Sequence, residues 1–200
     1  MTFTKPSFNV KRLRNGLAAS SLLLLTACIP TAIGIIAVTT IDLIKERRTV
    51  GTVVDDNLVE VSIRKEILGN KSLGRTVHIN PTALNGILLL TGEVNSAEQS
   101  QAAESIARSF QSVGQVVNQL DVAGKSSLTS RANDSLITAK VKTELIRNKN
   151  VDSTNVKVVT ERGVVYLLGI VTEIEGETAI QLAKKVGGVV RIVKVFMPPT

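Results

Sequence analysis

The chain has 200 residues, which is enough for one or two small domains, and a formal net charge of +7. The first 27 residues hold four basic side chains and no acidic one, so the remainder carries 20 basic against 17 acidic residues, a net charge of +3. Only three aromatic residues follow residue 28. Three rings in apolar segments are too few for a stacking platform, so we expect no nucleic-acid partner.

The N-terminus has the pattern of an export signal. Basic residues between positions 11 and 14 precede an apolar run at 17–25, and the run ends in Leu25-Thr26-Ala27-Cys28. A basic start, a short apolar core and a small-residue cleavage site define a secretory signal. We therefore predict a signal peptide at 1–27. Its end resembles the lipobox of bacterial lipoproteins, which implies lipidation of Cys28.

An uncleaved membrane anchor is the alternative for this segment. Residues 17–41 are almost free of charge and long enough to span a bilayer. If Cys28 is lipidated instead, Ile29 after it resembles the signal for sorting to the outer membrane. The folded part is then expected to face the periplasm, and display on the cell surface is the alternative. Cys28 is the only cysteine. Its lipidation leaves no thiol for a disulfide or a thiolate metal site.

After a linker at 28–54 the chain repeats itself. Asp56-Asn57-Leu58-Val59 returns 78 positions later as Asp134-Ser135-Leu136-Ile137. In both copies apolar residues recur at i, i+4 and i+8, which predicts one helix with a buried stripe. Asp56 and Asp134 are the expected N-caps, and Asn70 and Asn148 the expected ends.

Each repeat continues with a hairpin, a second helix and a last strand. Alternating residues predict the first strand, an Asn-Gly or Arg-Gly turn follows, and an apolar second strand ends at a glycine. A glycine inside a strand marks a bulge or a close backbone approach. Capping-box residues then open the second helix. The segments are strands at 77–79 and 156–158, strands at 87–90 and 164–167, glycines Gly92 and Gly169, boxes Ser96/Gln99 and Thr172/Glu175, and valine-rich strands at 113–117 and 186–190.

The predicted order is α-β-β-α-β in each repeat. A hairpin pairs its strands antiparallel, whereas a helical crossover favours parallel pairing. We predict an α/β fold of the α+β type, with two tandem domains at 55–123 and 134–197 joined by a connector at 124–133. Each has a small mixed three-stranded sheet packed on two helices. The shorter spacing to the second valine-rich segment predicts a second helix about one turn longer in the first repeat.

The repeated unit resembles the BON domain. The residues that carry the resemblance are Gly92 and Gly169 and the Val-Gly-x-Val-Val segments at 113–117 and 186–190. Together with the lipobox, the whole pattern is similar to the dual-BON outer-membrane lipoproteins of the DolP or YraP family. That resemblance implies binding of anionic phospholipid, a role in outer-membrane integrity and an association with the division site. Some members of the family are labelled haemolysins.

Charge distinguishes the two repeats. Residues 55–122 hold 5 basic and 8 acidic side chains, whereas residues 134–196 hold 10 basic and 7 acidic ones. The second repeat is therefore the better candidate for an anionic membrane surface. On its first helix, Leu136 occupies the family position of a leading apolar residue. Our hypothesis is that Leu136 enters the bilayer while Lys140, Lys142 and Arg147 meet headgroups.

The sequence favours a non-enzymatic protein. His78 is the sole histidine and lies in a short strand, and no nucleophile, phosphate loop or group of metal ligands accompanies it. We expect no catalytic residue, no cofactor and no metal site. Two alternatives to phospholipid binding stay open. One is a membrane-damaging, haemolysin-like factor, and the other is a scaffold that docks envelope proteins without touching lipid.

Overall fold

The computed structural model describes residues 50–73 and 76–199, all of which belong to one compact unit. The expected signal peptide, Cys28 and the linker up to residue 49 lie outside the described residues. Among the residues described, no helix has the length and apolarity needed to cross a bilayer.

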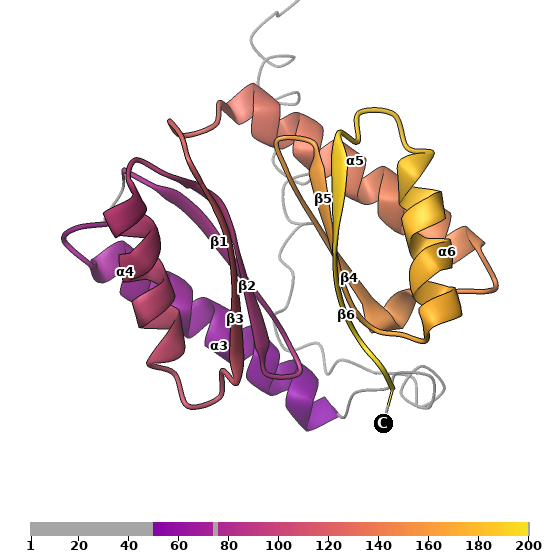
Figure 1. Cartoon of the computed structure of the whole chain (residues 1–200), viewed down its shortest axis with the longest axis horizontal. Coiled ribbons are helices and arrows are strands. Elements are labelled where there is room, and N and C mark those ends of the chain that lie inside the picture. The colour runs from indigo at the N-terminus through magenta and orange to yellow at the C-terminus, as the bar shows by residue number, and fades with distance from the viewer. Residues whose placement is uncertain (1–49, 74–75, 200) are drawn as a thin grey trace, which may run out of the picture. The chain divides into compact units, whose positions relative to one another are not determined.

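The two repeats have the predicted order of elements (Figure 1). The first repeat comprises α3 (Val50–Gly69), β1 (His78–Leu84), β2 (Ile87–Val94), α4 (Ala97–Arg108) and β3 (Gln115–Val122). The second repeat comprises α5 (Leu128–Arg147), the short 3-10 helix η1 (Ser153–Asn155), β4 (Val156–Glu161), β5 (Val164–Ile170), α6 (Glu173–Lys184) and β6 (Arg191–Met197).

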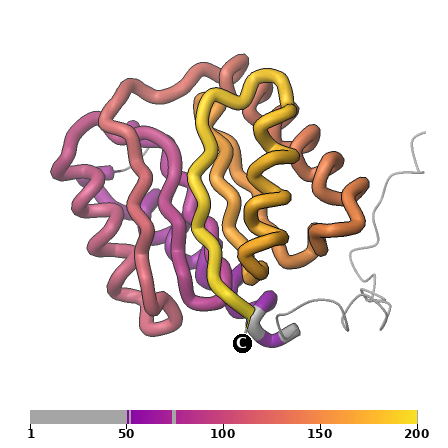
Figure 2. The backbone as a smooth tube through the Cα atoms, turned by 45° about the vertical axis from the view of Figure 1, so that its right-hand side comes forward, coloured from indigo at the N-terminus to yellow at the C-terminus, as the bar shows by residue number. Residues whose placement is uncertain are grey.

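Both sheets are mixed and three-stranded, as predicted. β1 pairs antiparallel with β2 and β2 pairs parallel with β3, and the second repeat reproduces this order with β4, β5 and β6. The backbone passes from β3 to α5 along one end of the two sheets (Figure 2). The fold is thus α+β, with two copies of one topology.

The predicted hairpin turns and the predicted helix ends at Asn70 and Asn148 are confirmed, but the predicted N-caps are wrong. Asn85 and Gly86 have φ of 49° and 79°, and Arg162 and Gly163 have 49° and 75°, as two-residue hairpin turns require. Helices α3 and α5 begin upstream of the predicted capping aspartates, and Ser127 caps α5.

Asp56 and Asp134 instead serve the hairpin turns from inside their helices. Asp56 accepts the N–H of Asn85 at 3.0 Å, and Asp134 accepts those of Arg162 and Gly163 at 2.9 and 2.8 Å. Both aspartates are buried. A turn with positive φ leaves N–H groups without ladder partners, and a buried N–H needs an acceptor.

The strand glycines lie at close backbone approaches. Gly92 has φ of 112°, and a Cβ there would overlap the carbonyl of His78. Gly169 faces the carbonyl of Asn155, 3.0 Å from where its Cβ would lie. The strand register is regular through both positions, so neither glycine forms a bulge.

The last strand of the second repeat differs from the prediction. Residues 186–190 form a turn, and β6 begins only at Arg191. Helices α4 and α6 both have 12 residues, so the prediction of a longer helix in the first repeat is also wrong. The two valine-rich segments are 73 positions apart, whereas the paired strand starts Gln115 and Arg191 are 76 apart, so the segments are not structurally equivalent. Pairing decides the strand start, because Gln115 pairs with Ile87 exactly as Arg191 pairs with Val164.

Each sheet is buried on both faces. Alternate strand residues pack on the helices of their own repeat, as Leu88 and Leu90 do in the first and Val165 and Leu167 in the second. The other residues of the same strands meet across the two sheets in a third core. Its buried members are Leu84, Leu89, Tyr166, Leu168 and Ile170. The helices thus lie on the outer faces and the sheets face each other (Figure 1).

Candidate functional site

A groove runs along the outer face of α5 in the second repeat. It has a volume of about 540 Å³ and contains Leu136, Lys140 and Arg147 from α5 together with Lys185 and Gly187 from the turn after α6. We call it the α5 groove. Leu136 is 60% exposed although it is a large apolar side chain. An exposed leucine beside several cations is a pairing typical of a surface that meets lipid or an amphipathic partner.

Cations predominate in the α5 groove. Lys140, Arg147 and Lys185 line it, against one acidic residue, Glu144. Arg147 lies 3.5 Å from Glu144 in an exposed i,i+3 pair, which has little effect on stability. Among the described residues, Lys140 and Lys185 take part in no ion pair. Their ammonium groups are therefore available to an anion.

The turn after α6 depends on one glycine. Gly188 has φ of 98°, and a Cβ at this residue would lie 2.9 Å from Cδ1 of Ile137 on α5. Only glycine fits both the left-handed backbone and this close approach. The turn can therefore approach α5 closely, which brings Lys185 to the edge of the α5 groove.

Three of the four predicted lipid-facing residues line the α5 groove. Leu136, Lys140 and Arg147 are there, whereas Lys142 lines a different pocket of about 200 Å³ with Ile146. Lys185 could not be grouped with them from the sequence, because it lies 38 or more positions beyond the groove residues of α5. Its position shortly before a Gly-Gly turn was the available signal.

The equivalent surface of the first repeat is more apolar, although α3 also carries the exposed Arg64 and Lys65. Leu58 of α3 corresponds to Leu136 and is also 60% exposed. Val54, Val61 and Leu68 are exposed on the same helix, at 49%, 66% and 60%. The two first helices therefore present different surfaces from the same position in the fold.

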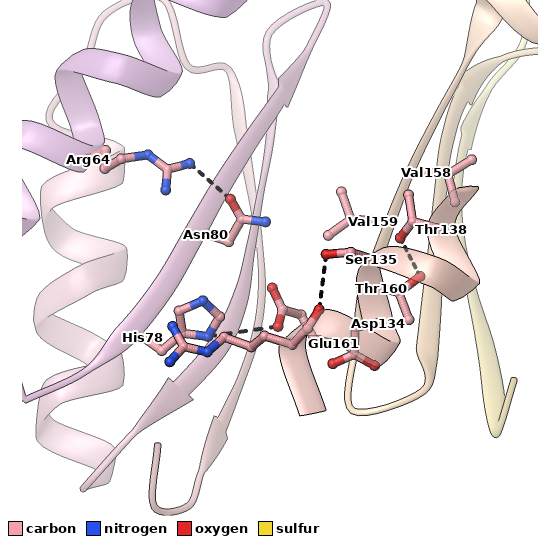
Figure 3. A pocket seen from close by; sticks show the side chains of 11 residues that line it. Arg64, His78, Asn80, Asp134, Ser135, Thr138, Val158, Val159, Thr160 and Glu161 are labelled. Carbon is pink, nitrogen blue, oxygen red and sulfur yellow. Dashed lines mark hydrogen bonds and ion pairs between the residues drawn. The ribbon is translucent and has the colours of Figure 1, made fainter. Parts of the chain in front are cut away.

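A second set of polar residues lies between the facing sheets. His78 and Glu93 form a cross-strand pair on β1 and β2, and Glu161 faces them from β4. Nδ1 of His78 is 3.2 Å from Oε2 of Glu93 and 3.8 Å from Oε2 of Glu161. Figure 3 shows His78 and Glu161 directed toward each other in a cavity of about 420 Å³. We call these three residues the junction cluster.

Burial and charge determine the protonation of the junction cluster. Burial raises the pKa of Glu161, with further contributions from the charges of Glu93 and Asp134, to about 7. Burial lowers the pKa of His78, although Glu93 partly opposes the shift. Burial alone would raise the pKa of Glu93, but hydrogen bonds from the Ser126 N–H and from Arg162 hold it below its ordinary value.

Charged side chains also connect the two repeats. Nε of Arg162 donates to Oε1 of Glu93 at 2.9 Å. Nζ of Lys157 lies 2.9 Å from Oε1 of Glu60 and donates to the carbonyl of Ala83 at 2.6 Å. Each of these contacts joins a residue of the second repeat to one of the first. The apolar core between the sheets therefore has polar contacts beside it.

Comparison with known families identifies the repeated unit. The family model described as "BON domain" matches residues 55–124 and 133–196. The chain belongs to the BON-domain family. Because the match occurs twice, the protein is a dual-BON protein.

Relatives of similar length show which kind of BON-domain protein this is. The chain is 33% identical over 149 residues to "Outer membrane lipoprotein DolP" of Haemophilus influenzae, covering 74% of this chain and 77% of that protein. It is 32% identical, with the same coverage, to "21 kDa hemolysin" of Actinobacillus pleuropneumoniae. It is 29% identical to "Osmotically-inducible protein Y" of Escherichia coli K12, over 70% of this chain and 71% of that one. The dual-BON protein is thus of the DolP type, a group of outer-membrane lipoproteins.

Proposed function

We propose that the protein is a lipid-anchored outer-membrane lipoprotein, facing the periplasm, whose α5 groove binds anionic phospholipid. The single observation that supports this most is the α5 groove, where the exposed Leu136 lies beside Lys140 and Lys185. The relatives of the DolP type support the compartment. In this proposal the lipid on Cys28 provides attachment, and the groove orients the second repeat on the membrane.

The energetics agree with a weak, orienting contact. Complete burial of an exposed leucine contributes about 1.5–3 kcal/mol, and Leu136 has 60% of its surface to bury. Each lysine or arginine near an anionic leaflet contributes about 1 kcal/mol. The electrostatic part decays over about 10 Å at 0.1 M salt. The α5 groove therefore has to lie against the headgroups, and a lipid on Cys28 would strengthen the contact by keeping the groove close to the membrane.

Vesicle co-sedimentation tests the groove without interference from the anchor. The assay uses a shortened protein, residues 45–200, which lacks Cys28 and therefore has no acyl chain to hold it on the vesicles. We expect it to sediment with phosphatidylglycerol vesicles and not with phosphatidylcholine vesicles, and to be released as salt rises. Absence of binding to either vesicle would favour the protein-docking scaffold. The exposed apolar residues of α3 are the observation that favours such docking.

Mass spectrometry of the protein from its native host tests the anchor separately. We expect a mature N-terminus at Cys28 that carries acyl chains. An intact N-terminal segment with a free thiol would contradict this part of the proposal and favour the membrane-spanning alternative. Lysis of erythrocytes by the purified protein would favour a haemolysin-like activity.

We further propose that membrane attachment serves outer-membrane integrity, with a place at the division site. The proposal follows from the resemblance to the DolP family described above, and the name of the Haemophilus influenzae relative supports only the outer-membrane location. Deletion should sensitise cells to detergents, and a fluorescent fusion should concentrate at the septum.

A further inference from the structure

The junction cluster brings together three metal-binding side chains from both repeats. His78 and Glu93 come from the first repeat and Glu161 from the second. One ligand atom from each residue lies within 4.8 Å of the ligand atoms of the other two. Since three strands position them, their spacing follows from the sheet packing and does not depend on a loop.

The distances suit a small tetrahedral cation. Ligands at about 2.0–2.1 Å from Zn²⁺ in tetrahedral arrangement are separated by about 3.4 Å. Nδ1 of His78 lies 3.2 and 3.8 Å from the two carboxylate oxygens, on either side of that value. An ion at the centre would require side-chain adjustments of a few tenths of an ångström at these two pairs. Nitrogen and oxygen ligands of this kind suit Zn²⁺ and similar transition ions.

The cations of the protein balance the junction cluster only in part, because Arg64 and Arg131 line the same cavity but, among the described residues, make no ion pair with its carboxylates. The Glu93 side chain is 1% exposed and that of Glu161 is 10% exposed. Arg162 is paired with Glu93, whereas in the described part of the chain Glu161 meets no lysine or arginine in an ion pair. Asp134 adds a further negative charge nearby. A buried carboxylate without a cationic partner is costly, so a cation at this point would be stabilised.

Surrounding groups hold the carboxylates in place. Arg162 and the N–H of Ser126 bind Glu93, and the side chains of Asn80 and Thr91 lie close enough to Glu161 to lower its pKa in part. Such outer partners orient ligands and tune metal affinity. The cavity of about 420 Å³ gives access, since His78 and Glu161 are among the residues that line it (Figure 3).

We propose that His78, Glu93 and Glu161 form a binding site for a divalent transition-metal ion of the Zn²⁺ class, which links the two repeats. Three protein ligands leave a fourth position for water from the cavity. The ion binds only where the sheets are packed together, and therefore stabilises the pair of repeats against unfolding. This inference goes beyond membrane binding and is independent of it.

Zinc titration of the full chain in detergent tests the site. All proteins carry Cys28→Ser, which removes the only thiol as a competing ligand. Glu161→Gln and His78→Asn remove one ligand each, and asparagine stands at the equivalent of His78 in the second repeat, Asn155. Glu60→Gln is the matched control, because it breaks another contact between the repeats, to Lys157, without touching the junction cluster.

We expect one Zn²⁺ per chain by calorimetry and a higher melting temperature with Zn²⁺ than with chelator. The Glu161→Gln and His78→Asn variants should lose at least tenfold in affinity and lose the thermal shift, whereas Glu60→Gln should keep both. Co²⁺ should give visible absorption bands that require His78, the sole histidine. Melting curves in chelator verify that each variant is folded. No zinc binding by the parent, or equal affinity in all three variants, would overturn the proposal.

Discussion

The two repeats share one topology but differ in what their equivalent positions carry. Leu58 and Leu136 are exposed to the same extent, and Leu136 lies in a groove with Lys140 and Arg147, whereas Ser62 and Gly69 stand at the equivalent positions of α3. The cross-strand pair of His78 and Glu93 has no chemical counterpart in the second repeat. The comparison shows that the fold sets where a side chain lies, whereas each copy has acquired its own surface chemistry. Substitutions at equivalent positions should therefore have unequal effects.

The largest difference is expected at the strand glycines. Gly92→Ala should lower the free energy of unfolding by about 3 kcal/mol or more, because the residue has positive φ and its Cβ would overlap the His78 carbonyl. Gly169→Ala should cost only about 1 kcal/mol, since its φ is ordinary and the Asn155 carbonyl is 3.0 Å from the new Cβ. Chemical denaturation measures both. Equal losses would contradict this asymmetry.

Glu161 should make the free energy of unfolding depend on pH. Its equivalent in the first repeat, at the end of β1, is the apolar Leu84, which cannot titrate. The pKa of Glu161 in the folded state, about 7, exceeds the ordinary value of 4.5 because of burial and the charges of Glu93 and Asp134. The folded state therefore binds more protons, and its stability falls as pH rises from about 4.5 to 7. The expected loss is up to about 3 kcal/mol.

Denaturation between pH 5 and 8, in chelator, measures this effect. Glu161→Gln should flatten the profile and leave the variant more stable than the parent at pH 8. Burial lowers the pKa of His78, which faces Glu161, so His78→Asn serves as the second profile. A parent profile as flat as that of Glu161→Gln would show that Glu161 does not titrate there.

Leucines at equivalent helix positions should differ in vesicle binding. Leu136→Asp should weaken sedimentation with phosphatidylglycerol vesicles at least tenfold, because it removes an insertable side chain and adds a negative charge. Leu58→Asp should leave binding unchanged. Both leucines are 60% exposed, so neither change should disturb folding. Loss of binding in Leu58→Asp alone would assign the membrane contact to the first repeat.

The smallest effect compares two lysines of one helix. Lys140→Ala should weaken vesicle binding about fivefold, which corresponds to about 1 kcal/mol for one cation at the surface. Lys142→Ala should weaken it less, because Lys142 lies outside the α5 groove. The same co-sedimentation assay measures both, and their difference should vanish in high salt. A larger effect at Lys142 would place the membrane on the adjacent face of α5.

Element order and pairing could be predicted from sequence because the signals are local. Apolar spacing defines the helices, Asn85-Gly86 and Arg162-Gly163 define the hairpins, and a helical crossover implies parallel pairing. The start of β6 could not be placed, since a valine-rich run resembles a strand whether or not a neighbour pairs with it. Only the register with β5 shows that residues 186–190 form a turn.

The candidate sites were harder to predict from the sequence, because tertiary contacts bring their residues together. Leu136, Lys140 and Arg147 could be grouped because helical spacing places them on one stripe, whereas Lys185 comes from another element. The junction cluster joins strands of both repeats, so no local pattern connects its members. A signal was present in the unbroken apolar runs of β2 and β5. Such runs are typical of strands buried on both faces.

Packing sheet against sheet has a consequence for how the protein meets other molecules. The inner faces of β2 and β5 pack against each other. A peptide or a bilayer can therefore contact only the helices and the strand edges. Recognition is thereby assigned to α3 and α5, the helices with exposed leucines. A mutation that separates the sheets would expose the apolar residues between them. The first consequence would be aggregation, before any loss of membrane affinity.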